Sequence, residues 1–280
     1  MHNFWTFYIQ YQKSSNFTAN LKVEEKLKLS VLKETDAGET RVAIVPKSIS
    51  KLMSLGFEVM VETNAGVSAA FTDIDYINAG ASIVAGAKEA IELSDVIVKI
   101  NPPSSENLAN LKSGQIWVSQ LFHRLNEDLI LSLESKGVKG LSLDAMPRIS
   151  RAQSMDILSS QSNLSGYKSV ICGADNLGKI FPMLTTAAGT ITPARVLIFG
   201  VGVAGLQAIA TAKRLGAVVE VSDTRPQVKE EVMSLGAKFI EVEGAADASK
   251  AGGYAVEQSD EFKQRQQQRL AESIAKADII

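Results

Sequence analysis

Residues 146–167 concentrate side chains that could orient a polar ligand. The segment reads MPRISRAQSMDILSSQSNLSGY, with two arginines, a glutamine and an aspartate within nine residues and serines beside them. A guanidinium fork, a bidentate amide and a carboxylate together suit a planar heterocycle that must be held in one orientation. The alternative interpretation is a hydrogen-bonded hinge between two domains that holds no ligand.

A glycine-rich turn predicts a dinucleotide site. GVGVAG puts Gly200, Gly202 and Gly205 in G-x-G-x-x-G register, directly after an apolar run typical of a strand and at the start of a helical pattern. The first glycine permits a tight turn, the second lets a pyrophosphate approach, and the third lets helix and strand pack closely. The helix N-terminus adds partial positive charge. A structural turn without a ligand is the alternative.

Two charged residues after the next predicted strand bear on the choice of nucleotide. Asp223 would accept both ribose hydroxyls and repel a 2′-phosphate, which favours NAD over NADP. Arg225 keeps the opposite choice open, because an arginine can hold a 2′-phosphate. Arg225 can also be read as a solvated loop cation.

Other candidate catalytic residues are few. His123 is either a general base or a structural residue, and the other histidine is His2. Lys99 ends an apolar run, where it either contacts a substrate or reaches solvent. The single cysteine, Cys172, excludes an internal disulfide, suits a reducing compartment and is expected in the core. Metal-ligand spacings are lacking.

Composition indicates a globular protein with a full core. The chain has 280 residues, 45% of them hydrophobic. Its net charge of −2 and its pI near 5.8 give no basic surface, so we do not expect it to bind nucleic acid. The longest apolar stretch, 196–212, reads as strand, turn and helix and not as a membrane span. Residues 1–26 lack the features of a signal peptide and are expected to form a poorly ordered tail.

Alternating strand and helix patterns predict an α/β fold with parallel sheets. In a first domain, 27–153, strands are expected at 27–32, 57–62, 81–84, 95–100, 114–119 and 138–143. Helices are expected between them at 46–56, 73–80, 87–94, 105–114 and 126–137.

A second domain, 154–280, repeats the alternation. Its opening stretch to about residue 189 is expected to be largely helical. Strands are then expected at 195–200, 217–223 and 237–243, and helices at 201–216 and 226–236. A mobile loop and an exposed helix should follow Glu243, and ESIAKADII should begin a further strand. A doubly wound sheet needs at least one more strand, so the chain is expected to be truncated at its C-terminus.

Four segments together resemble the NAD(H)-binding component of proton-translocating NAD(P) transhydrogenase, which is related to alanine dehydrogenase. They are KETDAGETRVAIVP, MPRISRAQSMDILSSQSNLSGY, FGVGVAGLQAIATAKRLGA and GGYA. The resemblance covers about residues 27–280. It implies two Rossmann-like domains with the nucleotide in the cleft between them. It also implies a homodimer on the cytoplasmic, inner face of a bacterial-type membrane. The partners would be a membrane-embedded proton-conducting subunit and an NADP(H)-binding domain, with hydride passing directly between the nicotinamides.

The resemblance also implies roles for individual residues. Those that would hold the nicotinamide ring, its amide and the nearby phosphate or ribose are Arg148, Gln153, Asp156 and Ser159. The remaining NAD(H) contacts would be Gly200, Gly202, Val203, Gly205, Asp223, Thr224, Arg225, Gly253 and Tyr254.

Alanine dehydrogenase is the alternative within the same resemblance. That enzyme needs a lysine, an arginine and a histidine. Here Lys99 and Arg41 stand at the places of the lysine and the arginine. Asn126 stands at the place of the histidine, and His123 lies three residues before it. Oxidising an amine requires a proton acceptor, whereas hydride exchange between nicotinamides requires only proximity and orientation. The scarcity of histidine therefore favours transhydrogenation. A non-catalytic, truncated nucleotide-binding remnant is a third interpretation.

Overall fold

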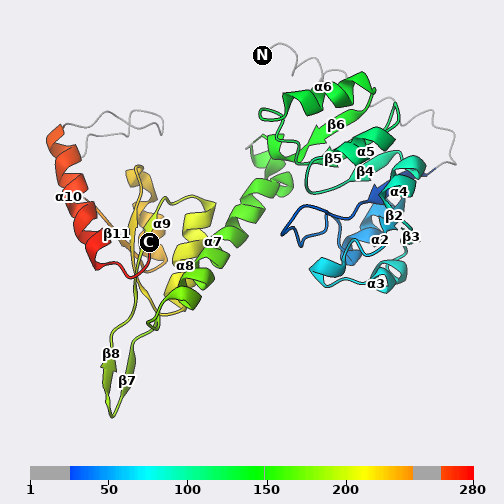
Figure 1. Cartoon of the computed structure of the whole chain (residues 1–280). Coiled ribbons are helices and arrows are strands. Elements are labelled where there is room, and N and C mark those ends of the chain that lie inside the picture. Colours follow the sequence, from blue (N-terminus) through cyan, green and yellow to red (C-terminus); the bar gives the residue numbers. More distant parts are fainter. Residues whose placement is uncertain (1–25, 148, 242–259) are drawn as a thin grey trace. The chain divides into compact units, whose positions relative to one another are not determined.

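The computed structural model describes residues 26–147, 149–241 and 260–280 (Figure 1). The chain divides into two compact units, one ending at Met155 and the other running from Asp156 to Ile280. Each unit is built on its own parallel sheet. The α/β fold with parallel sheets, predicted from strand–helix alternation, is therefore confirmed, as are the two Rossmann-like domains that the resemblance implied.

The first unit contains a six-stranded sheet in the order β3-β2-β1-β4-β5-β6. Its strands are β1 (Leu27–Val31), β2 (Phe57–Glu62), β3 (Ser82–Val84), β4 (Val96–Val98), β5 (Ile116–Ser119) and β6 (Lys139–Ser142). All neighbouring strands are parallel. The chain order reverses between β1 and β4, and ligands of open α/β sheets bind at the carboxyl ends of the strands at such a reversal.

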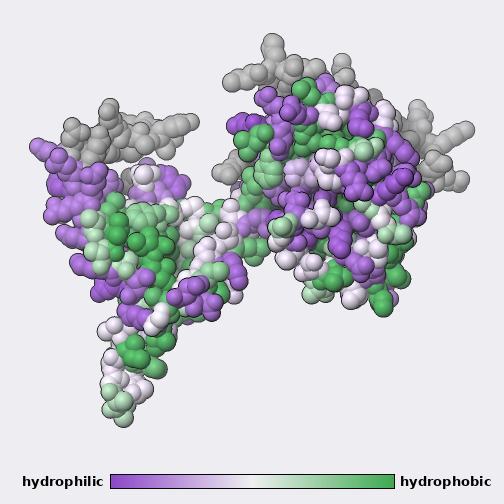
Figure 2. Space-filling view, in the orientation of Figure 1, coloured by the Kyte–Doolittle hydropathy of each residue, from purple (hydrophilic) through white to green (hydrophobic). Residues whose placement is uncertain are grey.

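Helices cover both faces of this sheet. They are α2 (Pro46–Ser54), α3 (Asp73–Asn78), α4 (Ala87–Leu93), α5 (Ser105–Asn110) and α6 (Glu127–Ser135). Ile49 and Tyr76 pack on one face, and Ile91 and Leu133 pack on the other. Burial on both faces explains the apolar runs VMV in β2 and VIV in β4. Hydrophilic side chains cover much of the unit's outer surface in Figure 2.

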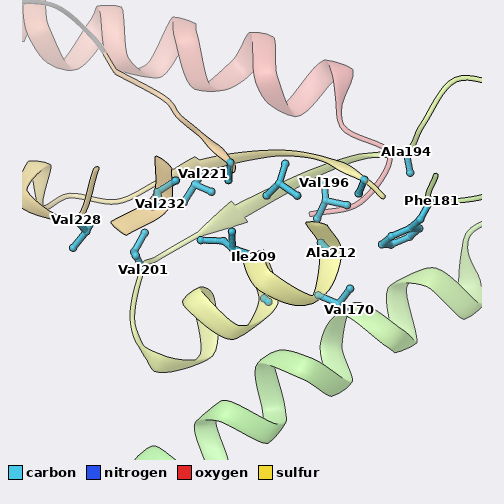
Figure 3. Close-up of a cluster of buried hydrophobic side chains, with 14 residues drawn as sticks. Val170, Phe181, Ala194, Val196, Val201, Ile209, Ala212, Val221, Val228 and Val232 are labelled. Carbon is cyan, nitrogen blue, oxygen red and sulfur yellow. The ribbon is translucent and has the colours of Figure 1, made fainter. Parts of the chain in front are cut away.

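The second unit has a three-stranded parallel sheet in the order β11-β10-β9. Its strands are β9 (Arg195–Phe199), β10 (Val218–Ser222) and β11 (Lys238–Phe239), and its helices are α7 (Ile157–Asn176), α8 (Val203–Arg214), α9 (Lys229–Ser234) and α10 (Asp260–Lys276). Val196 and Val221 of the sheet form one core with Ile209 of α8 and Val170 of α7 (Figure 3). The helix α8 therefore lies between the sheet and α7.

Close contact between α7 and α8 depends on Gly166. A β-carbon at this position would overlap the backbone carbonyl of Ala204, in the first turn of α8. A glycine inside a helix costs stability through its conformational freedom. Here it permits two helix backbones to touch directly behind the glycine-rich turn.

The expected helical stretch from Ser154 to about residue 189 is only partly correct. α7 ends at Asn176, and residues 184–191 form an antiparallel hairpin of β7 (Leu184–Thr186) and β8 (Gly189–Ile191). Figure 1 shows this hairpin extending away from the sheet of its own unit. Its six strand residues are all exposed, so no buried face imposed a hydrophobic pattern that could reveal it.

Other expectations near the C-terminus need correction. Residues 272–276 belong to α10 and not to a strand, and only Ile279 forms a parallel bridge, with Val196. The third strand of the second unit is shorter than the predicted 237–243, and the loop expected after Glu243 lies outside the described residues.

The expectation for the single cysteine was wrong. Cys172 is exposed on α7 and is not a core residue.

We predict that Gly166→Ala lowers the free energy of unfolding by about 1–3 kcal/mol, because the new methyl group forces the two helices apart. Gly178→Ala is the matched control, since a β-carbon there meets nothing within 4 Å. Its effect should stay within about 0.5 kcal/mol. Urea unfolding followed by circular dichroism measures both. A stabilised Gly166→Ala variant, as helix propensity alone predicts, would show that the helices are not in contact here.

Candidate functional site

The glycine-rich turn joins β9 to α8. Gly200 has a φ of +91°, a conformation that side-chain-bearing residues rarely adopt, and Gly202 is the N-cap of α8. A β-carbon on Gly205 would overlap the carbonyl oxygen of Gly200. Val203 is the first residue of α8, and its side chain is exposed. The three glycines thus have the geometric roles of a dinucleotide fingerprint, with the helix N-terminus open beside them.

Asp223 connects the end of β10 to this turn. Its Oδ2 accepts a hydrogen bond of 2.6 Å from the backbone amide of Val201, and its Oδ1 accepts one of 2.7 Å from the backbone amide of Arg225. The guanidinium of Arg225 donates from Nε to Oδ1 and from Nη2 to Oδ2, each at 3.1 Å. Nη2 also donates to the carbonyl oxygen of Val201. Thr224, between the two charged residues, is exposed.

These contacts keep the carboxylate ionised. Burial of Asp223 opposes its charge, but the hydrogen bonds from Arg225 and from the two backbone amides outweigh burial and lower the pKa of the carboxyl below its ordinary value. The same ion pair raises the pKa of Arg225. Asp223 is therefore an anion at neutral pH, as recognition of ribose hydroxyls requires.

Asp156 begins α7 as its N-cap. Its carboxylate accepts the backbone amide of Ser159 at 2.9 Å and the hydroxyl of Ser159 at 2.7 Å. These two predicted nicotinamide contacts therefore lie together at the start of one helix. Gln153 is exposed in the 3₁₀ helix Ser150–Met155 of the first unit.

Three of the predicted site residues lie outside the described portion of the chain. They are Arg148, Gly253 and Tyr254.

The switch point of the first sheet holds a buried ion pair that the sequence patterns did not predict. The ammonium of Lys99 lies 3.7 Å from the carboxylate of Glu34, and both side chains are 2% exposed. Glu34 also accepts the backbone amide of Ile100 at 2.6 Å. Lys99 borders a cleft of about 680 Å³ that also includes Lys88 of α4. The ammonium of Lys99 is therefore shielded from bulk solvent and is paired with the carboxylate of Glu34. The position of Glu34 just after a buried strand was the available signal.

The residues considered for amino-acid oxidation have other partners. Arg41 is held by Glu39 at 2.6 Å, and this hydrogen bond lowers the pKa of Glu39 to about 2. The side chain of Asn126 donates to the carbonyl oxygen of Leu121 at 2.9 Å, and His123 is exposed. Asn126 thus fixes the loop that precedes α6.

The described ranges contain neither a metal-binding cluster nor a membrane-spanning helix. No group of histidine, cysteine or carboxylate side chains in them could hold a metal ion. Within the same ranges, no helix combines the length and apolar character needed to cross a bilayer.

Comparison with known proteins places this geometry in a family. The model of the alanine dehydrogenase/PNT N-terminal domain matches residues 30–165, and that of the C-terminal domain matches residues 169–280. The chain belongs to the alanine dehydrogenase/PNT family. Its Rossmann-like domains are thus those of a family of oxidoreductases that bind nicotinamide nucleotides.

Within this family the chain is more similar to transhydrogenases. It is 48% identical over 260 residues to an NAD(P) transhydrogenase subunit alpha polypeptide of Rhodospirillum rubrum, covering 90% of this chain and 68% of that protein. A transhydrogenase structure from Sinorhizobium meliloti aligns with a TM-score of 0.81 and 42% identity, over 90% of this chain and 68% of that one. Alanine dehydrogenase of Methanococcus maripaludis is 31% identical over 198 residues, covering 70% of this chain and 52% of that enzyme.

We predict that Asp156→Ala lowers the free energy of unfolding by about 1 kcal/mol, because α7 loses its N-cap. Asp156→Asn should cost less than about 0.5 kcal/mol, since asparagine caps helices as well as aspartate does. Urea unfolding measures both changes. Equal losses in the two variants would show that the charge of Asp156, and not its hydrogen bonds to Ser159, stabilises the unit.

Proposed function

We propose that this chain binds NAD(H) and presents the nicotinamide for direct hydride transfer to NADP(H) held by a partner domain. The transfer is coupled to proton translocation by a membrane-embedded partner. The observation that carries the proposal is the ionised Asp223 at the glycine-rich turn. The similarity to transhydrogenase alpha subunits, at 48% identity for the Rhodospirillum rubrum protein, supports the partner reaction.

The adenosine half of NAD(H) is assigned to the second unit. In this proposal the pyrophosphate approaches Gly202 and Val203 at the N-terminus of α8, and the ribose hydroxyls donate to Asp223. Thr224, Arg225, Gly253 and Tyr254 complete the nucleotide contacts. The nicotinamide is oriented by Arg148, Gln153, Asp156 and Ser159. A carboxylate that already accepts two donors at the start of α7 is a fixed reference point for such orientation.

The reaction makes few demands on side-chain chemistry. A hydride carries two electrons from C4 of one nicotinamide to C4 of the other, so no proton has to be taken up by the protein. Only positioning is needed, and a displacement of about 1 Å can cost on the order of 100-fold in rate. His123, the histidine among the described residues, is exposed and has no role in this step.

We also propose that the chain forms a homodimer at the inner face of the membrane. The β7–β8 hairpin supports the dimer. Leu184 and Ile191 face each other across the hairpin, and each is about half exposed. Figure 2 shows hydrophobic surface along its stem. An isolated two-stranded hairpin is marginally stable in water, so a second copy that covers these side chains would stabilise it.

We predict that the chain binds NADH about tenfold or more tightly than NADPH, because Asp223 repels a 2′-phosphate. Asp223→Ala should weaken NADH binding by about 1–3 kcal/mol, because it removes the acceptor for the ribose and also the hydrogen bond that aligns the glycine-rich turn through Val201. Fluorescence titration with each reduced nucleotide measures both effects. Asp175→Ala, which removes an exposed carboxylate near the far end of α7, is the control.

Three outcomes would contradict the proposal. NADPH binding as tight as NADH binding would show that Asp223 does not select the nucleotide. Absence of binding to either nucleotide would leave the non-catalytic interpretation. Reduction of NAD by alanine at an ordinary enzymatic rate, on the order of 10 per second, would instead assign the chain to amino-acid oxidation.

A further inference from the structure

The carboxylate of Asp223 has its acceptor positions occupied before any nucleotide arrives. Each of its oxygens accepts one backbone amide and one guanidinium nitrogen. Oδ1 accepts the amide and Nε of Arg225, and Oδ2 accepts the amide of Val201 and Nη2 of Arg225. A carboxylate oxygen offers about two acceptor positions. A ribose with two hydroxyls to donate therefore meets a carboxylate that is already saturated.

The two kinds of donor differ in whether they can leave. The backbone amide of Val201 is fixed, because Val201 belongs to the glycine-rich turn and is buried, and the backbone amide of Arg225 does not rotate with its side chain. The side chain of Arg225 is 49% exposed, whereas that of Asp223 is 5% exposed. The guanidinium makes one further hydrogen bond, from Nη2 to the carbonyl oxygen of Val201, which is partly buried and would be broken together with the ion pair. Withdrawal of the guanidinium frees one acceptor position on each oxygen and leaves both backbone bonds intact.

We propose that the guanidinium of Arg225 acts as a latch on Asp223: it must withdraw from the carboxylate before NAD(H) binds. The same residue weakens the discrimination between NAD(H) and NADP(H). This inference rests on the proposed function, since it concerns the same nucleotide site. The two positions that the guanidinium vacates match the two hydroxyls of an adenosine ribose in number. The 2′-hydroxyl thus replaces an existing charge-assisted hydrogen bond, and its net contribution to affinity is small.

The latch has an opposite consequence for a 2′-phosphate. While Arg225 is paired with Asp223, the carboxylate presents less net charge to an approaching anion. Once released, the guanidinium is a cation within reach of the 2′ position, and arginine holds phosphate through paired hydrogen bonds. The pair therefore favours NAD(H) less strongly than a lone aspartate.

Three adenosine ligands separate these effects without the nicotinamide. 5′-AMP carries both ribose hydroxyls, 2′-deoxy-5′-AMP lacks one, and adenosine 2′,5′-bisphosphate carries the phosphate of NADP. Calorimetric titration of the chain with each ligand gives two ratios of dissociation constants relative to 5′-AMP. Because each ratio compares ligands on one variant, a general loss of adenine contacts cancels.

Arg225→Met should raise both ratios. The 2′-deoxy ratio should rise roughly threefold to tenfold, because the hydroxyl now replaces only water on Asp223. The bisphosphate ratio should rise by about tenfold or more, since the cation is gone. Arg225→Lys keeps the charge but lacks the two-armed fork, so it should raise the first ratio and leave the second near the wild-type value. Arg214→Met, at the opposite end of α8, is the control and should change neither ratio.

The outcomes distinguish failure of the latch from failure of the nucleotide site. Equal weakening of all three ligands in Arg225→Met, with both ratios unchanged, would overturn the latch while nucleotide binding stands. A fall in the 2′-deoxy ratio would also overturn it, because the arginine would then assist the hydroxyl. If the unmodified chain binds none of the three ligands, the latch falls together with the proposed function.

Discussion

The hydrogen bond from the backbone amide of Val201 to Asp223 joins the two strands that carry the proposed nucleotide site. It connects the turn after β9 to the residue after β10, over 22 positions of sequence, at a distance of 2.6 Å. Around it, Gly205 brings α8 against Gly200, and Gly166 brings α7 against Ala204. If the glycine-rich turn were displaced, it would no longer be aligned with the carboxylate of Asp223. The first turn of α8 would move with it, and α7 would lose its packing against α8.

The first unit uses the same kind of connection at its switch point, with a different consequence. The carboxylate of Glu34, after β1, accepts the backbone amide of Ile100, after β4, also at 2.6 Å. Its cation, Lys99, is 2% exposed, whereas Arg225 in the second unit is 49% exposed. Breaking a buried pair leaves an uncompensated charge, which is strongly destabilising. Glu34 and Lys99 therefore hold the carboxyl ends of β1 and β4 together. The pair formed by Asp223 and Arg225 is able to exchange partners.

What could be predicted from the sequence follows from which interactions leave a local pattern. Strands buried on both faces had to be apolar, so β1 and β2 were located within one residue of their ends. The fingerprint glycines and Asp223 were recognisable because their spacing is set by one strand–turn–helix unit. The β7–β8 hairpin left no such pattern, since its side chains are exposed. The pairing of Glu34 with Lys99 joins residues far apart in sequence, which no local spacing reveals. The saturation of Asp223 by Arg225 depends on side-chain geometry that residue types alone do not specify.

Isotope transfer tests the proposal that hydride passes directly from a nicotinamide bound by this chain to the nicotinamide of NADP. The chain is combined with an NADP-binding partner domain and NADH that carries deuterium at the transferred position of C4. Mass spectrometry then follows the label in ordinary water. We expect the deuterium to appear in NADPH in equal amount to the NADH oxidised, with none released to solvent. Loss of the label to water would contradict the claim, because it would require a protein group or another carrier to exchange the hydrogen between the two nucleotides.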